Sequence, residues 1–176
     1  LIDATDITVV AASGTTGAGR TLRSNLLTSE SANSLSSYKF GGVHQHTPEI
    51  EETLAAINSQ PVKISFTPIL APMPRGILST STAKLIKAIS ESELIQIFQN
   101  FYQDSSDIYI CEAQEMPMTN AVLGSNKVMM KIGIDQHTNR VIVSTAIDNL
   151  TKGAAGQAIQ NLNIMNNLHE KTGLSK

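Results

Sequence analysis

Residues 127–147, KVMMKIGIDQHTNRVIVSTAI, limit the possible folds of this chain more than any other segment. Two apolar runs rich in β-branched residues flank a short polar stretch, Asp135–Asn139. This pattern is typical of a β-hairpin. Because a hairpin pairs its strands antiparallel, the chain is expected to contain at least part of an antiparallel sheet.

Four further segments predict strands. Residues 7–14 form a β-branched apolar run that ends in Ser-Gly, and residues 62–70 alternate between apolar and polar side chains. Two prolines in residues 71–76 cannot donate to a sheet ladder, so they separate the second strand from a third at 76–86. A short strand is predicted at 107–112.

The first predicted helix starts at Thr47, which can serve as N-cap, with Pro48 at the first helical position. Ile50, Leu54 and Ile57 then follow at i, i+4 and i+7. This spacing predicts an amphipathic helix of about three turns.

Two more helices are predicted further along the chain. The helix at 91–104 has an apolar stripe made of Leu94, Ile97, Phe98 and Phe101. The helix at about 153–168 has one apolar face, made of Ala155, Ile159, Leu162 and Met165. The polar residues 21–37 have no clear period and predict a long, mobile surface loop.

These elements predict an α+β fold, with a mixed, mostly antiparallel sheet whose helices cover one face. No internal repeat, low-complexity tract or linker divides the sequence, so residues 1–176 are predicted to form a single domain. The first residues lack both an initiator Met and a basic-then-apolar signal pattern. The chain is therefore expected to be part of a longer protein.

Composition excludes several classes of function. With 13 basic and 15 acidic residues, 4% aromatics and no Trp, the chain offers neither the charge nor the stacking surface expected of a nucleic-acid-binding protein. No apolar run approaches 18 residues, so no membrane span is expected. The single cysteine excludes an internal disulfide framework and indicates a reduced, cytoplasmic setting.

His44 and His46 are the first candidate site residues, and three interpretations are open. A metal site needs a third ligand, which Glu49, Asp135 or His137 could supply. The imidazoles could instead act in acid/base chemistry or substrate binding near neutral pH. They could also be ordinary packed or surface side chains satisfied by hydrogen bonds.

The glycine-rich stretch SGTTGAGR, residues 13–20, fits neither the P-loop nor the Rossmann spacing. It could form an anion-binding nest aided by Arg20, or a simple turn. Cys111 lies in an apolar, strand-like segment without a basic neighbour, which indicates a buried, unreactive thiol. Small residues at 153–156 permit either anion binding at a helix start or close packing.

Taken together and in order, five segments resemble the C-terminal portion of the N-acetyl-gamma-glutamyl-phosphate reductase family. They span residues 12 to 163 and read ASGTTGAGR, YKFGGVHQHTPEIEE, FTPILAPMPRGILST, PMTNAVLGSNKV and DNLTKGAAGQAIQNLN. The resemblance implies a domain like the C-terminal domain of glyceraldehyde-3-phosphate dehydrogenase, which binds substrate and dimerises. It also implies a preceding Rossmann domain that binds NADP.

The resemblance also implies a reaction. Members reduce N-acetyl-glutamyl phosphate to N-acetylglutamate semialdehyde and phosphate, in arginine biosynthesis. A cysteine thiolate displaces phosphate, a hydride from NADPH reduces the thioester, and a histidine handles the proton. The partners implied are this substrate pair, the chain's own Rossmann domain and further copies of the chain, in a homo-oligomer.

Site residues carry over by motif. His44 matches the acid/base histidine of the family and His46 its companion in the active site. The residues expected at the substrate are Tyr38, Ser13, Gly14, Arg20 and Arg75, the last in either a structural or a substrate-binding role. Asn149 matches a position that reaches the nicotinamide carboxamide, and Gly153 and Gly156 would let the last helix lie against the nucleotide domain.

The chain departs from the family pattern in two respects. It contains neither the glycine fingerprint of the Rossmann domain nor the Asn-Pro-Gly-Cys motif of the nucleophile, and Cys111 does not align with that nucleophile. Many members have Lys or Ser at position 12 and Arg at 45, where this chain has Ala12 and Gln45. Because the Rossmann fingerprint and the nucleophile motif are missing from it, the fragment alone is expected to be inactive.

Two alternatives from other classes remain open at this stage. One is a small metal-binding or hydrolase-like domain that uses His44 and His46. The other is an interaction domain without catalysis.

Overall fold

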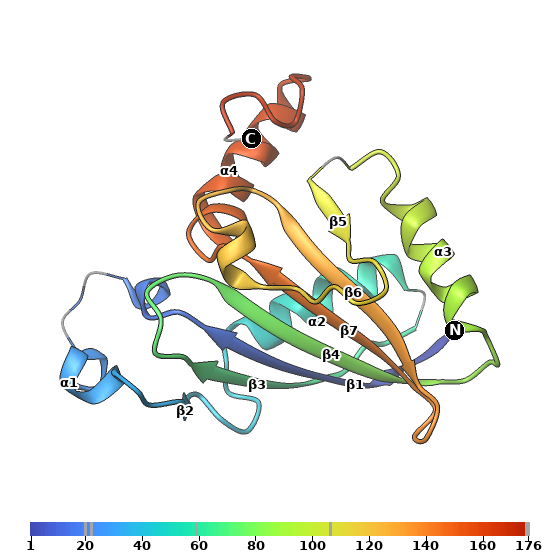
Figure 1. The fold of residues 1–176 in the computed structure, drawn as a ribbon, viewed down its shortest axis with the longest axis horizontal. Helices are drawn as coiled ribbons and strands as arrows, with labels where there is room; N and C mark the ends of the chain where they lie inside the picture. The colour runs from blue at the N-terminus through green and yellow to red at the C-terminus, as the bar shows by residue number, and fades with distance from the viewer. Residues whose placement is uncertain (20, 22, 59, 106, 175–176) are drawn as a thin grey trace.

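A computed structural model describes residues 1–19, 21, 23–58, 60–105 and 107–174. Its centre is a seven-stranded sheet with the strand order β2-β3-β1-β4-β7-β6-β5 (Figure 1). The β1–β3 and β5–β6 pairs are parallel and the other four pairs are antiparallel. The predicted mixed, mostly antiparallel sheet is confirmed.

The strands agree with the predicted segments, apart from the start of the first and from β2, which lies in the segment predicted to be a loop. They are β1 (Ile2–Ser13), β2 (Ser36–Ser37), β3 (Ile64–Leu70), β4 (Ile77–Leu85), β5 (Ile108–Ile110), β6 (Val128–Asp135) and β7 (Arg140–Ile147). β6 and β7 form the predicted hairpin, with Val128 opposite Ile147 and Asp135 opposite Arg140. Asn139 has a φ of 53° in its turn, a left-handed conformation that Asn tolerates.

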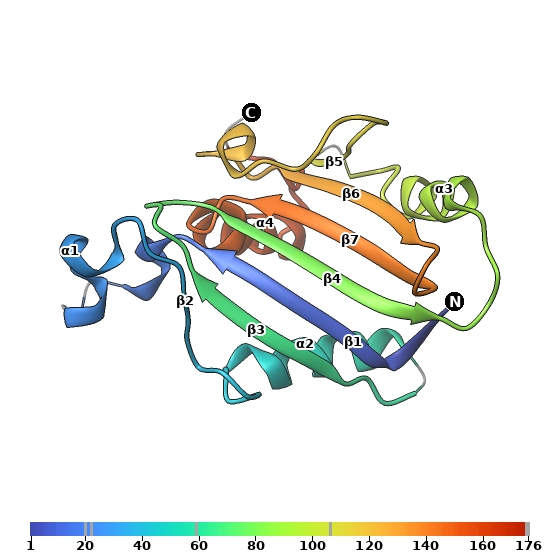
Figure 2. The ribbon, with the colours of Figure 1, turned by 60° about the horizontal axis from the view of Figure 1, so that its bottom comes forward.

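The helices are α1 (Thr28–Ser31), α2 (His46–Ile57), α3 (Glu91–Phe101) and α4 (Gly156–Met165). A π-helical turn, Thr151–Ala155, leads directly into α4. Figure 2 shows α2 and α4 behind the sheet, with the front of β3, β1, β4 and β7 uncovered. No helix in the described part of the chain combines the length and hydrophobicity that crossing a membrane requires.

Strand alternation divides the core between the two faces of the sheet. On the helix-covered face, Leu94 of α3 packs with alternate residues of three strands, including Ala83, Ile132 and Val141. On the other face, Cys111 and Val122 pack on Met129 and Ala146. The segment between β5 and β6 therefore covers one end of the face that the helices leave open.

The predicted N-cap of α2 is wrong. The helix begins at His46 and Gln45 is its N-cap residue. The Thr47 N–H already donates to the carbonyl of His44, at 3.0 Å, so Thr47 lies inside the first turn. Its buried Oγ1 has no hydrogen-bond partner among the described residues.

The apolar stripe of the last helix faces outward. Leu162 and Met165 are 58% and 80% exposed, whereas Gln160 and Asn163 are buried. A helix that lies against a nucleotide domain, as the resemblance implies, is expected to have exposed apolar area in this chain, and such area is present. A helix of a globular domain normally buries its apolar side, so the orientation of α4 is unusual.

Residues 21–37 were predicted to form a loop, and the structure adds short helical turns to it. Within the described part, a 3₁₀ turn (Ser24–Leu26), α1 and β2 interrupt an otherwise irregular and largely exposed segment. Its predicted mobility stays a prediction.

Candidate active site

A cavity of about 530 Å³ lies at the end of the sheet where β1, β3 and β7 finish and β4 begins. Its floor includes Ala11, Phe66 and Pro68 of the helix-covered face. Three loop regions supply the walls, within residues 13–23, 38–46 and 149–154. Segments more than 100 residues apart in the sequence thus converge on one space.

Most of the predicted site residues line this cavity. They are Ser13, Gly14, Tyr38, His44, His46, Asn149 and Gly153. Arg75 and Gly156 are not among the lining residues and pack behind the walls. The predicted role of Arg20 falls outside the described residues.

His44 is held by a set of rings. Its side chain is 6% exposed, and its ring centroid lies 5.7 Å from that of Tyr38 and 5.1 Å from that of Phe66. The ring of His46 lies 4.8 Å away at a steep angle. The two imidazoles are therefore neighbours, with His44 just before α2 and His46 at its first residue.

The hydrogen bonding of His44 determines which nitrogen can serve a substrate. Its Nδ1 accepts the backbone N–H of His46 at 3.2 Å. An accepting Nδ1 carries no proton, so in the neutral ring the proton is on Nε2. Burial lowers the pKa of His44, and the nearby His46 and Lys39 lower it further, against an opposing effect of Glu49. The neutral form with Nε2–H is therefore the resting state near pH 7.

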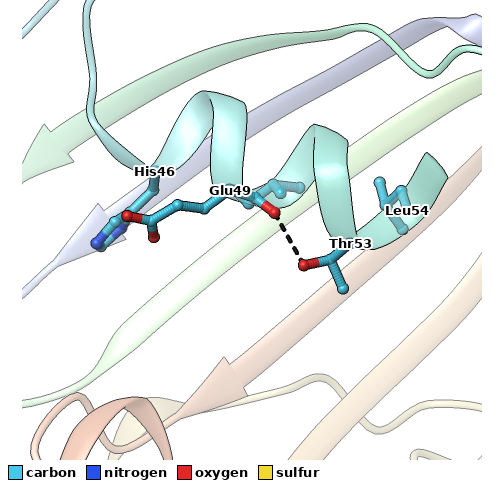
Figure 3. Close-up of a pocket in the computed structure, with 5 residues that line it drawn as sticks. His46, Glu49, Thr53 and Leu54 are labelled. Carbon is cyan, nitrogen blue, oxygen red and sulfur yellow. Dashed lines mark hydrogen bonds between the residues drawn. The ribbon is translucent and has the colours of Figure 1, made fainter. Parts of the chain in front are cut away.

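A smaller depression of about 380 Å³ follows the outer surface of α2 (Figure 3). His46, Glu49, Ile50, Thr53 and Leu54 line it, and the Thr53 hydroxyl donates to the Glu49 carbonyl at 2.8 Å. All five residues belong to one helix, so this is a surface groove. Of the five, only His46 also lines the larger cavity.

The glycine-rich loop uses several of its N–H groups to hold the loop between β3 and β4. The N–H groups of Gly14, Thr15 and Thr16 donate to the carbonyls of Gly76, Met73 and Pro74, at 2.8, 3.0 and 3.3 Å. A Cβ on Gly14 would lie 2.9 Å from the backbone N of Arg75. These three N–H groups are committed to the protein, so the geometry favours a structural loop over an anion nest formed by them.

Arg75 closes the same region from behind. Its Nη2 donates to both carboxylate oxygens of Asp148 at 2.7 Å, and Asp148 is fully buried. Asp148 also accepts the backbone N–H groups of Gly124, Leu150 and Thr151. Although burial opposes ionisation, these hydrogen bonds hold the pKa of Asp148 well below its usual range. This geometry supports a structural role for Arg75.

Asn149 connects this ion pair to the cavity. Its Oδ1 accepts the N–H of Gly76 at 2.7 Å, and its Nδ2 donates to the hydroxyl of Thr16 at 3.0 Å. One hydrogen of Nδ2 remains for a ligand in the cavity. Gly153 lines the same wall, while Gly156 packs so closely on Asn126 and Thr151 that a Cβ would not fit.

The charges around the cavity are one-sided. Arg23 and Lys39 line it, and no carboxylate does so among the described lining residues. Such a cavity attracts anionic ligands. Arg23, Lys39 and Asp148 were not among the predicted site residues, and Gln45 appeared only as a departure from the family pattern. Asp148 and Lys39 could have been found beside Asn149 and Tyr38 in the quoted motifs, whereas Arg23 carried no local signal.

Two other chemistries find little support in the structure. Within the described ranges, no group of three or more His, Cys, Asp or Glu side chains could hold a metal ion. Cys111 is buried as predicted, and burial raises the pKa of its thiol, which disfavours the nucleophilic thiolate.

Comparison with known proteins adds the family context. Residues 1–149 match the model of the family described as "semialdehyde dehydrogenase, dimerisation domain". The N-acetyl-gamma-glutamyl-phosphate reductase of Acidothermus cellulolyticus is 51% identical over all 176 residues, and that of Renibacterium salmoninarum is 48% identical over 177 aligned positions. The match covers 100% and 98% of this chain, and 51% and 50% of those proteins. The chain thus spans about half the length of the curated relatives it matches.

Solved structures confirm the predicted fold. Aspartate semialdehyde dehydrogenase II from Vibrio cholerae superposes with a TM-score of 0.71 at 15% identity, over 93% of this chain and 56% of that chain. The aspartate semialdehyde dehydrogenase of Francisella tularensis gives 0.61 at 17% identity, over 75% and 39%. At these identities, the likeness concerns the fold alone.

Proposed function

Since the chain belongs to the semialdehyde dehydrogenase dimerisation-domain family, we propose that it is the substrate-binding and dimerisation half of an NADP-dependent N-acetyl-gamma-glutamyl-phosphate reductase. The complete enzyme would convert N-acetyl-glutamyl phosphate to N-acetylglutamate semialdehyde and phosphate, a step of arginine biosynthesis in the cytoplasm. The observation that carries the proposal is the cavity, where a buried, neutral histidine lies among cations and hydroxyl groups.

The charge of the cavity suits this substrate. N-acetyl-glutamyl phosphate has an anionic group at each end, a phosphoryl group and a carboxylate. Arg23 and Lys39 supply two cations from two different segments of the cavity wall. Because no carboxylate lines the described wall, neither anion of the substrate would meet a like charge.

His44 is the proposed acid/base residue. Its Nδ1 is occupied by the N–H of His46, so Nε2–H is the group that can donate to the carbonyl oxygen of the substrate as that oxygen acquires charge. After hydride transfer, the imidazolium form of the ring would give the Nε2 proton to the oxygen on the former acyl carbon, and Nε2 would take that proton back when the C–S bond breaks and the aldehyde forms. His46 orients the ring of His44 through its backbone N–H, so both histidines contribute to the site.

NADPH, when bound, would supply the hydride that reduces the acyl group. The residues present fit a nicotinamide ring at the 149–154 wall, because Asn149 retains one amide hydrogen and Gly153 and Ala154 leave space there. Asn149 would hold the carboxamide of the ring through that hydrogen, in an orientation fixed by its bonds to Gly76 and Thr16.

The nucleophilic thiolate would come from the nucleotide-binding half, because the one cysteine of this chain is buried in the core on the other face of the sheet. We expect the 176 residues alone to lack activity for that reason. The exposed apolar stripe of α4, which includes Leu162 and Met165, would dock on that half.

The uncovered face of the sheet is the surface we propose for a second copy of the chain. It displays Thr8 and Val10 of β1 and Thr80 of β4, side chains without charge that suit a sheet-on-sheet contact. A homo-oligomer would bury this face, in keeping with the family's description as a dimerisation domain.

The test uses the chain joined to its nucleotide-binding half, with NADP⁺ reduction measured in the presence of N-acetylglutamate semialdehyde and phosphate. The enzyme should be active, and His44→Asn should lower kcat by about 10²- to 10⁴-fold, the range typical of a lost acid/base group. His137→Asn is the matched control, because His137 is exposed in the β6–β7 turn, away from the cavity.

Three results would contradict the proposal. The first is an inactive wild-type enzyme, and the second is a His44→Asn variant with the kcat of the wild type. The third is a stoichiometric zinc ion that is lost in a His44→Ala/His46→Ala double variant, which would favour a metal-binding domain instead.

A further inference from the structure

We propose that Lys39 is a specificity-determining residue of the cavity, and that its ammonium group binds the carboxylate at the amino-acid end of the substrate. This inference deepens the proposed function and rests on it. It depends on the placement of the Lys39 side chain, on its backbone conformation and on the division of charge in the cavity wall.

The Lys39 side chain is oriented by a neighbour that also lines the cavity. Its Nζ donates to Oε1 of Gln45 at 2.9 Å, and Gln45 directly follows His44 in sequence. An ammonium group has three hydrogens, and this bond uses one of them. The other two are available to an anionic ligand in the cavity that also contains the proposed acid/base residue.

The backbone of Lys39 has an uncommon conformation. Its φ is +44°, in the left-handed region that favours Gly, and Gly41 and Gly42 follow with φ of 82° and 81°. Glycine at 39 would adopt this conformation without strain. Residues held in such conformations cluster at functional sites, which is consistent with a role for the Lys39 side chain itself.

Lys39 also brings a positive charge that the described residues around it leave unbalanced. The three ion pairs of the described chain involve Arg75, Arg140 and Lys171 instead. This charge acts on the ring of His44. Burial lowers the pKa of His44 most, and the charges of His46 and then Lys39 lower it further. An anion bound at Lys39 would therefore lie close to the reacting group.

The two cations of the cavity differ in the kind of anionic group that each is shaped to bind. Arg23 presents a planar fork of donors that matches a phosphoryl group, on the segment that follows the glycine-rich loop. The ammonium of Lys39 is a compact point charge. Both bind oxyanions, so the assignment of Lys39 to the carboxylate has to be separated from phosphate binding by experiment.

The complete enzyme separates them when it runs in the oxidative direction, because N-acetylglutamate semialdehyde and phosphate then have their own KM values. Lys39→Met removes the charge, and Lys39→Asn removes it with a residue that tolerates a left-handed backbone. Both variants should raise the KM for the semialdehyde about tenfold or more, as expected for a lost hydrogen bond to a charged group. The KM for phosphate should change by less than about threefold. Lys39→Arg, which keeps the positive charge, should have a KM for the semialdehyde close to that of the wild type.

Lys63→Met is the matched control, because Lys63 is exposed and does not line the cavity. A rise in the phosphate KM alone would overturn the assignment, as would unchanged KM values in both Lys39 variants. If the wild-type enzyme is active and only this result fails, the inference alone is wrong. If the wild-type enzyme does not oxidise the semialdehyde, the proposed function fails and the inference fails with it.

Discussion

One wall of the cavity is tied together far more tightly than the other. Residues 13–19, 73–76 and 148–151, which we name the locked wall, are joined by backbone hydrogen bonds, by Asn149 and by the Arg75–Asp148 pair. Residues 38–46, the recognition wall, place Phe40 and Val43 in solvent and contain three residues with positive φ. Its side-chain bonds run within the wall, from Lys39 to Gln45 and from the His46 N–H to His44.

The difference separates two tasks. Apart from one Nδ2 hydrogen of Asn149, the side chains of the locked wall use their donors and acceptors within the protein, so this wall holds a ligand mainly by shape and position. The recognition wall keeps donors free at His44 and Lys39. Changes in the locked wall should therefore act on stability, and changes in the recognition wall on ligand binding and proton transfer.

The strongest test of this contrast is Asp148→Asn. The amide nitrogen would replace one carboxylate oxygen, although both oxygens accept hydrogen bonds and neither position suits a donor. We expect a loss of about 3 kcal/mol in the free energy of unfolding, at the low end for a broken buried pair because the Arg75 side chain is 30% exposed. Urea unfolding followed by circular dichroism measures it.

Asp6→Asn is the matched control for this substitution. Asp6 pairs with Arg140 at 2.8 Å, but its side chain is 45% exposed. Breaking an exposed pair costs about 1 kcal/mol or less. Equal losses in the two variants would show that the Arg75–Asp148 pair does not lock the wall.

A steric test of the same wall gives a smaller effect. In Gly14→Ala, the added methyl group would meet the Arg75 backbone at 2.9–3.0 Å, and backbone atoms cannot move aside cheaply. We expect a loss of about 1–3 kcal/mol in unfolding free energy. The measurement is the shift in the midpoint of chemical unfolding at constant slope.

Gly17→Ala serves as its control within the same loop. A methyl group there would lie 3.6 Å from Nδ2 of Asn149, an ordinary contact, so the change should stay within about 0.5 kcal/mol. If Gly14→Ala were as well tolerated as Gly17→Ala, the close approach of the two loops would not contribute to the stability of the wall.

The sequence predicted the strands and helices well because each depends on a local pattern. The hairpin of β6 and β7 follows from alternation around a polar turn, and α3 follows from an apolar stripe that includes Leu94 and Phe98. The outward stripe of α4 was expected only through the resemblance, because spacing shows that Ile159 and Leu162 share a face but not what covers it. The start of α2 was misplaced because an early turn from His44 overrode the capping signal of Thr47.

The site residues also fall into those that a local motif indicated and those that only the folded structure brings together. Residues within motifs, such as His44 and Asn149, were found through the resemblance and do converge on the cavity. Lys39 was missed because its importance depends on a left-handed backbone and a bond to Gln45, neither of which a sequence pattern indicates. Non-local pairs such as Arg75–Asp148 are likewise invisible until the fold brings them together.

The finest test of the recognition wall concerns the pKa of His44. Burial lowers it most, then His46 and Lys39, while Glu49 raises it. Lys39→Met should therefore raise the pKa of His44, and Glu49→Gln should lower it further, whereas Lys63→Met should leave it unchanged. Titration of the His44 ring proton signals by NMR measures each value.

The lowered pKa of His44 also makes the stability of the protein depend on pH. Because the folded protein disfavours the charged ring, its folded pKa lies below the unfolded one, and the unfolded chain binds the proton first as the pH falls. The contribution of His44 to stability is thus fully present above the ordinary histidine pKa and declines as the pH falls through the folded pKa. Lys39→Met should reduce this decline, since it brings the two pKa values closer together. If the decline were unchanged and the pKa of His44 did not move, the recognition wall would be electrostatically independent of Lys39.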